Sequence, residues 1–231
     1  MVVRRHAIAD RPGVEWVHAA LDGLAATDFA APVPVGHFDG ASSAIVAGSL
    51  WSAVTYLEGE VVGWSSPPDM ATMGAFLATF HEAAAQVAVA GQRPDAFPIS
   101  LPGDARREAQ LVHGDMTNHN VLAVDGVPCA AIDFMNAFVA VPLFDIGCAL
   151  WRSGRPMQES VAFDGGRIRD YVDGYSSVRP LSADDRAAVV PYLRARGVQI
   201  LEKQARRGVD DDGPRRRLAW LDAHAHELTL R

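Results

Sequence analysis

Hydrophobic residues spaced three and four positions apart predict a series of helices. One is expected over residues 13–26 and another over 70–90, where Asp69 supplies a favourable N-cap. In the C-terminal half, the same spacing predicts helices over residues 143–151, 168–175, 183–207 and 215–228. The second half of the chain is therefore expected to be mainly helical.

Short apolar runs bounded by glycine and proline predict strands. These segments are residues 2–5, 33–38, 44–57, 121–124 and 129–132. The last two flank Asp125-Gly126, a sequence typical of a hairpin turn. A strand-rich section thus precedes a helix-rich one, which predicts an α+β protein with a mixed N-terminal lobe over residues 1–58 and a larger helical lobe over 59–231.

Composition narrows the class of protein. The chain has 231 residues, is 49% hydrophobic and carries a net charge of −7, which argues against a nucleic-acid surface and mildly favours a cationic partner. No apolar run reaches the roughly 18 residues of a membrane span, and Arg4 and Arg5 interrupt any signal-peptide core. We therefore expect a cytoplasmic protein, with Cys129 and Cys148 as reduced thiols.

Three polar residues are spaced for phosphoryl transfer. Asp115 occupies a polar turn after a hydrophobic strand, Asn120 follows five residues later, and Asp133 ends the second strand of the predicted hairpin. An amide oxygen and a carboxylate are oxygen ligands of the kind that Mg²⁺ prefers. A base, an amide and a metal-binding acid in this order form the phosphoryl-transfer arrangement of kinases.

The same residues carry a resemblance to a known family. His113-Gly114-Asp115 with Asn120, followed by Ile132-Asp133-Phe134, resembles the signature of the aminoglycoside phosphotransferase and choline kinase-like family. Supporting matches are Asp145 after Pro142, the helix end at Leu77–His81 and a hinge-like segment at Tyr56–Gly59. The resemblance implies a protein kinase-like two-lobe fold, with a truncated N-terminal sheet lobe and a helical C-terminal lobe.

The resemblance also implies roles for individual residues of the catalytic region. Asp115 would be the catalytic base or would orient the substrate hydroxyl, and Asn120 and Asp133 would bind Mg²⁺. His113 would brace the catalytic loop, and Asp145 would tie that loop to the helix behind it.

Nucleotide contacts are implied nearer the N-terminus. Arg4 or Arg5 would contact the phosphates, and Glu15 would be the ion-pair partner, a role for which Asp10 and His18 compete. Tyr56, in the hinge-like segment, would contact the nucleotide.

The sequence departs from the family at its start. Members normally carry a hairpin with a phosphate-covering glycine-rich loop before the strand that matches Val2–Arg5, whereas no Gly-x-Gly-x-x-Gly occurs here and Lys203 is the only lysine. Either the start was assigned late or the loop has been lost. An uncovered sheet edge tends to pair with another chain, so a homodimer through this edge is expected.

The implied activity is transfer of the γ-phosphate of ATP or GTP, with Mg²⁺, to a hydroxyl of a small molecule. Aminoglycoside-, choline- and amino alcohol-like acceptors remain open. The alternative is a catalytically silent, kinase-like binding module that kept Asp115, Asn120 and Asp133 but lost productive nucleotide binding.

Overall fold

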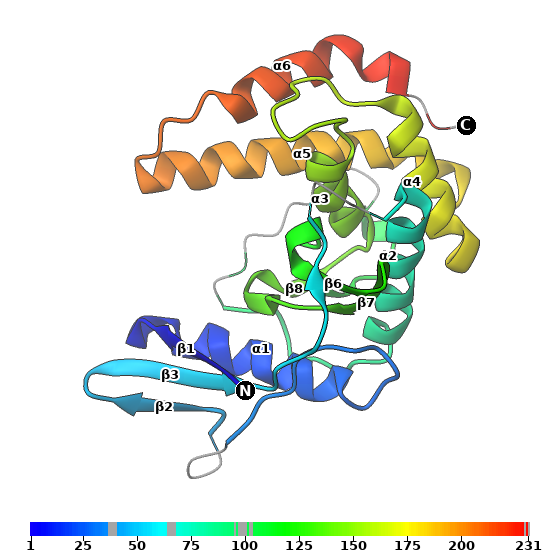
Figure 1. Ribbon diagram of the computed structural model, residues 1–231. Coiled ribbons are helices and arrows are strands. Elements are labelled where there is room, and N and C mark those ends of the chain that lie inside the picture. Colours follow the sequence, from blue (N-terminus) through cyan, green and yellow to red (C-terminus); the bar gives the residue numbers. More distant parts are fainter. Residues whose placement is uncertain are drawn as a thin grey trace.

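The computed structural model describes residues 1–36, 41–63, 68–94, 96, 101, 104–228 and 230. It is a mixed fold in which small sheets lie at one end and between helices, and longer helices gather at the other end (Figure 1). The α+β class expected from the sequence is confirmed.

The N-terminal part is a three-stranded antiparallel sheet with one helix. Strands β1 (Val2–His6), β2 (Ser43–Val46) and β3 (Ser49–Val54) lie in the order β1-β3-β2, so β1 is an edge strand. Helix α1 (Arg11–Leu24) buries one apolar face in the core. The lobe boundary at residue 58 falls in the connection after β3. Both that boundary and a homodimer through β1 remain predictions.

Two small sheets lie at the centre of the molecule. The first has the order β4-β6-β7, built from β4 (Glu60–Val61), β6 (Val121–Val124) and β7 (Val127–Ala131). The second pairs β5 (Gln110–Val112) with β8 (Phe138–Ala140). The polar segment 113–120 leaves β5 and enters β6, so this pair of sheets fixes both of its ends.

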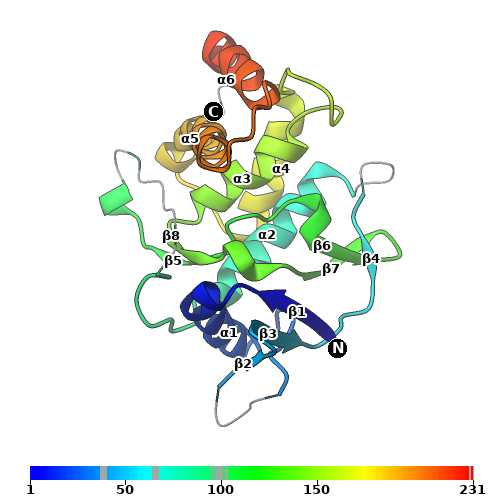
Figure 2. The same cartoon turned by 90° about the vertical axis from the view of Figure 1, so that its left-hand side faces the viewer.

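The helices cover these sheets from the opposite end to the N-terminal sheet. Helices α2 (Met70–Ala84) and α4 (Gly165–Val178) pack against each other, as do α3 (Leu143–Ser153) and α5 (Ala183–Arg207). Helix α6 (Gly213–His224) runs along α5 at the far end of the molecule (Figures 1 and 2). A single hydrophobic cluster continues from α1 through α2 and α3 to α5.

Several elements differ from those expected. The segment 44–57 is a hairpin rather than one strand, because Ala47 and Gly48 adopt positive φ angles and reverse the chain. Within 33–38, Pro34 forms only an isolated bridge to Val54, and residues 37 and 38 lie outside the described part. The helix from Met70 ends at Ala84 instead of reaching residue 90.

The structure contains no helix long and apolar enough to cross a membrane among the residues it describes.

Candidate active site

A buried carboxylate holds the backbone of the catalytic loop. Asp145, in the first turn of α3, is fully buried, and its two oxygens accept hydrogen bonds from the backbone N–H groups of His113 and Gly114, both at 2.7 Å. His81 of α2 lies 3.2 Å from the same carboxylate and 2.8 Å from the hydroxyl of Tyr175 in α4. The predicted role of Asp145, tying the loop to the helix behind it, fits these contacts.

Both ring nitrogens of His113 form hydrogen bonds. Its Nε2 lies 2.9 Å from the carbonyl oxygen of Ile132, which can only accept, so Nε2 carries the proton. Its Nδ1 accepts the backbone N–H of Asp115 at 3.3 Å. The ring also packs on Phe134, with centroids 4.5 Å apart. His113 therefore braces both segments that carry the candidate metal ligands.

Gly114 is required by the path of the loop. Its φ is +76°, in the left-handed region, and an added Cβ would lie 2.1 Å from the carbonyl oxygen of Asn136. Any larger residue would push the loop away from the segment after β7.

Backbone and amide contacts bring the three predicted chemical groups together. The Asn120 side-chain nitrogen donates to the carbonyl oxygen of Asp115 at 2.8 Å, and the backbone N–H of Ile132 donates to the Asn120 carbonyl oxygen at 2.8 Å. Asp133 follows in a left-handed conformation with φ of 62°. Asp115, Asn120 and Asp133 thus lie on one connected frame.

The oxygen atoms of Asn120 and Asp133 are suitable ligands for Mg²⁺. The side-chain nitrogen of Asn120 donates to the Asp115 carbonyl oxygen. The side-chain oxygen of Asn120, Oδ1, is therefore the amide atom that can coordinate a metal ion. Asp133 supplies a carboxylate that is 38% exposed. Mg²⁺ in nucleotide sites is held by one or two protein oxygens together with phosphate oxygens, so two such ligands are sufficient.

Arg4 lies beside the candidate metal ligand. Its Nη1 is 2.6 Å from Asp133 Oδ1, and both residues line a cavity of about 260 Å³ between β1, α1 and the catalytic sheet. Arg5 points to the other face of β1, since side chains alternate along a strand. Tyr56 and His18 also line this cavity. The structure thus distinguishes Arg4 from Arg5, which the sequence left open.

Glu15, the expected partner of this arginine, makes other contacts in the structure. Glu15 bonds Arg11, one turn earlier on α1, at 2.7 Å, and accepts from the Ser43 hydroxyl at 3.3 Å. A pair four residues apart on one helix is geometrically easy to form. Among the described residues, the ion pair of Arg4 is with Asp133 instead.

One residue at the site was not predicted. Arg196 of α5 is 9% exposed, and its Nη2 lies 2.8 Å from Asp115 Oδ1. It shares the buried face of its helix with Tyr192 and Leu193. The only signal in the sequence was its position on that apolar face, where an arginine needs a partner.

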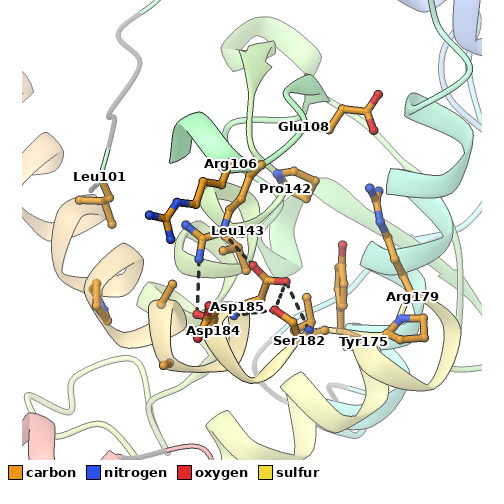
Figure 3. Close-up of a pocket in the computed structure, with 16 residues that line it drawn as sticks. Leu101, Arg106, Glu108, Pro142, Leu143, Tyr175, Arg179, Ser182, Asp184 and Asp185 are labelled. Atoms are coloured by element: carbon orange, nitrogen blue, oxygen red, sulfur yellow. Dashed lines mark hydrogen bonds and ion pairs between the residues drawn. The ribbon is translucent and has the colours of Figure 1, made fainter. Parts of the chain in front are cut away.

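A larger pocket lies elsewhere. It has a volume of about 880 Å³ and is lined by residues from the start of α5, the end of α4 and the segment before β5, including Asp184, Asp185 and Arg179 (Figure 3). Arg107 bonds Asp185 at 2.8 Å across it. Asp184 precedes Arg196 by twelve residues, which is about 18 Å along the helix. No residue of the segment 113–120 is among the described residues that line this pocket.

Comparison with known proteins agrees with this site. Residues 90–181 match the model of the Phosphotransferase enzyme family. The homoserine kinase of Acidiphilium cryptum is 27% identical, with 86% of this chain and 70% of that protein covered. The homoserine kinase of Methylobacillus glycogenes is also 27% identical, with 77% of this chain and 64% of that protein covered.

Solved structures share the fold at lower identity. A microcompartment-associated aminopropanol kinase has a TM-score of 0.69 and 17% identity, covering 99% of this chain and 86% of its own. An amicoumacin kinase in complex with AMP-PNP and Ca²⁺ has a TM-score of 0.71 and 15% identity. The match covers 98% of this chain and 81% of the kinase chain.

The solved structures show that the chain has the protein kinase-like fold that the resemblance in the motifs implied. The chain is thus similar to the Phosphotransferase enzyme family over residues 90–181, and the curated relatives that it matches are homoserine kinases.

Proposed function

We propose that the protein transfers the γ-phosphate of a magnesium-bound nucleoside triphosphate, ATP or GTP, to a hydroxyl of a small molecule. The observation that carries this proposal is the connected frame of Asp115, Asn120 and Asp133 behind His113. Homoserine kinase and aminopropanol kinase name acceptors that bear both a hydroxyl and an amino group. An amino alcohol or a hydroxy amino acid is the acceptor class that we favour over aminoglycosides and choline.

The reaction is an in-line displacement in which positioning does most of the work. The acceptor oxygen forms a bond to the γ-phosphorus while the bond from that phosphorus to the β,γ-bridging oxygen breaks. The nucleoside diphosphate leaves, and the acceptor proton passes to the Asp115 carboxylate. Arg196 holds that carboxylate in place through its 2.8 Å contact.

Asn120 and Asp133 would hold the metal. When bound, Mg²⁺ supplies positive charge that offsets the charge of the transferring phosphate. Arg4, which contacts Asp133, is placed to add a second cation on the phosphate side of the cavity.

Asp115→Asn tests the base. Turnover is expected to fall by at least about 10²-fold, because the amide cannot accept the hydroxyl proton. Mg-nucleotide binding should change little, whereas the unfolding temperature should fall somewhat, because the nearly buried Arg196 loses its carboxylate partner. Asp125→Asn, in the exposed turn between β6 and β7, is the matched control. If Asp115→Asn kept the wild-type turnover, Asp115 would not be the catalytic base.

Nucleotide binding distinguishes an active kinase from the silent binding module. Mg-ATP or Mg-GTP at about 100 times its dissociation constant stabilises the protein by roughly 2.7 kcal/mol, a rise of several degrees in unfolding temperature. The rise should disappear in Asp133→Ala. A rise without transfer to any acceptor would favour the silent module, and no rise with either nucleotide would contradict the kinase proposal.

A further inference from the structure

The Asp115 carboxylate is anchored through one of its two oxygens. Its Oδ1 accepts a hydrogen bond from Nη2 of Arg196 at 2.8 Å, whereas no hydrogen bond or ion pair from the described part of the chain reaches Oδ2. The backbone of Asp115 is held as well, because its N–H donates to the His113 ring and its carbonyl oxygen accepts from Asn120. Oδ2 is therefore the oxygen of this carboxylate that is available to a substrate.

Arg196 is itself held by a second side chain. Its Nη1 donates to the side-chain oxygen of Gln199, about one turn further along α5. Arg196 is 9% exposed and Gln199 is 2% exposed, so water competes little for either group. The amide of Gln199 is a neutral acceptor, which fixes the direction of the guanidinium without neutralising the charge that attracts Asp115.

The backbone that carries Arg196 packs tightly against α3. Gly197, the next residue, lies so close to Trp151 that an added Cβ would be 2.5 Å from the indole ring. Helix α3 in turn contacts the catalytic loop, since the Cys148 sulfur lies 3.7 Å from the carbonyl oxygen of Gly114. The Arg196 side chain thus joins a closely packed part of the helical region to the catalytic loop.

We propose that Gln199 and Arg196 form a positioning relay, which holds Oδ1 of Asp115 so that Oδ2 faces the acceptor hydroxyl and receives its proton. The inference rests on the proposed kinase function and adds Gln199 to it as a residue that acts at a distance from the reacting atoms. A carboxylate free to rotate would present either oxygen, and a misplacement of about 1 Å can cost about 10²-fold in rate. The relay removes that freedom before the substrate binds.

Steady-state kinetics with Mg-ATP test the relay. The acceptors are homoserine, 3-aminopropan-1-ol and ethanolamine, and hydrolysis of Mg-ATP by water supplies the rate if none of the three is phosphorylated. Arg196→Met should lower kcat by about 10- to 100-fold and Gln199→Met by about three- to tenfold. The KM for Mg-ATP should change by less than about twofold in both variants, because neither side chain lines the cavity that contains Arg4.

Arg196→Lys separates the charge from the geometry. A lysine keeps the positive charge but lacks the planar fork that contacts Asp115 and Gln199 together, so it should recover only part of the kcat lost in Arg196→Met. Arg194→Met is the control, because Arg194 pairs with Asp222 at 2.6 Å on an exposed part of the same helix. This control should keep the wild-type kcat.

A double variant distinguishes positioning from a purely structural role. If Arg196 acts only through the Asp115 carboxylate, Arg196→Met should cost no more than about twofold in the Asp115→Asn background, because the group that it positions is already lost. A structural role would lower the rate by the same factor in both backgrounds. All rates are measured below the unfolding transition of each variant.

The relay is overturned if folded Arg196→Met and Gln199→Met keep the wild-type kcat, or if Arg196→Met costs as much in the Asp115→Asn background as it does alone. A rise confined to the KM for Mg-ATP also overturns it, since Arg196 would then serve the nucleotide. If Arg196→Met does not fold, Arg196→Lys and Gln199→Met decide by the same criteria. These outcomes leave the kinase function standing, whereas a wild-type protein without any turnover, hydrolysis included, would contradict the function and the relay together.

Discussion

At the scale of single residues, the direction of a side chain decides what it can do. Arg4 and Arg5 are neighbours with the same chemistry, but strand alternation sends only Arg4 into the cavity with Asp133. A cation at this place can neutralise either the Asp133 carboxylate or the phosphates that Mg²⁺ brings to it. Arg4 is therefore the arginine of this pair whose replacement is expected to affect nucleotide binding.

Replacing each arginine separately should reveal this difference. Arg4→Ala is expected to weaken Mg-nucleotide binding by roughly 10- to 100-fold, the loss of a charge-assisted contact worth about 1.5–3 kcal/mol. Arg5→Ala is the matched control and should bind nucleotide like the wild type. Stability should fall by at most about 1 kcal/mol in Arg4→Ala, since its ion pair is partly exposed. Equal nucleotide affinity in all three proteins would exclude a phosphate contact.

The sequence motif drew attention to candidate residues that share one loop, but no motif indicated Arg196. His113, Asp115 and Asn120 share one short loop, so their spacing alone reveals their chemistry. Arg196 meets Asp115 across 81 residues, and only the packing of two helices brings them together. Glu15 was assigned to a distant arginine, but the local pair with Arg11 formed instead.

At the scale of elements, the residues that begin and end a helix predicted its boundaries best. Helix α5 runs over Ala183–Arg207 as predicted, because Ser182 forms a capping box at its start and Gly208 takes the left-handed conformation that ends it. Strand β8 was not predicted, because its three residues are too few to show a pattern and gain their structure from pairing with β5.

The crossing of α3 and α5 sets the position of Arg196, and Gly147 permits it. An added Cβ there would lie 2.7 Å from the backbone of Tyr192. Gly147→Ala should therefore force α5 outward and displace Arg196 from Asp115. We expect a loss of about 1–3 kcal/mol in unfolding free energy and a fall in kcat larger than any change in nucleotide affinity.

Thermal unfolding and steady-state kinetics measure both effects. Gly165→Ala, in the first turn of α4, is the control, because its Cβ would meet only ordinary contacts at 3.5 Å or more. If Gly147→Ala kept the wild-type kcat despite a lower unfolding temperature, the helix crossing would not position Arg196 for catalysis.

At the scale of the whole molecule, one buried carboxylate joins the parts that must act together. Asp145 links the catalytic loop to α2 through His81, and His81 links onward to Tyr175 in α4. Burial is the main cause that lowers the pKa of His81, so the ring is neutral at pH 7. Burial also lowers the pKa values of His6, His18 and His119.

These histidines make stability depend on pH with a definite sign. Below the ordinary pKa of 6.5 the unfolded chain binds protons that the folded chain excludes, so acid favours unfolding. The stabilisation is complete above about pH 7.5 and is lost as the pH falls through 6.5 toward the lowered values. Each histidine that stays neutral contributes up to about 1.4 kcal/mol per pH unit to this slope.

Denaturant unfolding between pH 5 and 7.5 should show the slope, and His81→Gln should reduce it. Glutamine can still donate to Asp145 but binds no proton, so the variant is expected to be less stable at pH 7.5 yet less sensitive to acid. His226→Gln, at a side chain that is 77% exposed, should keep the wild-type slope. An unchanged slope in His81→Gln would mean that the contact with Asp145 holds His81 equally well in its protonated form.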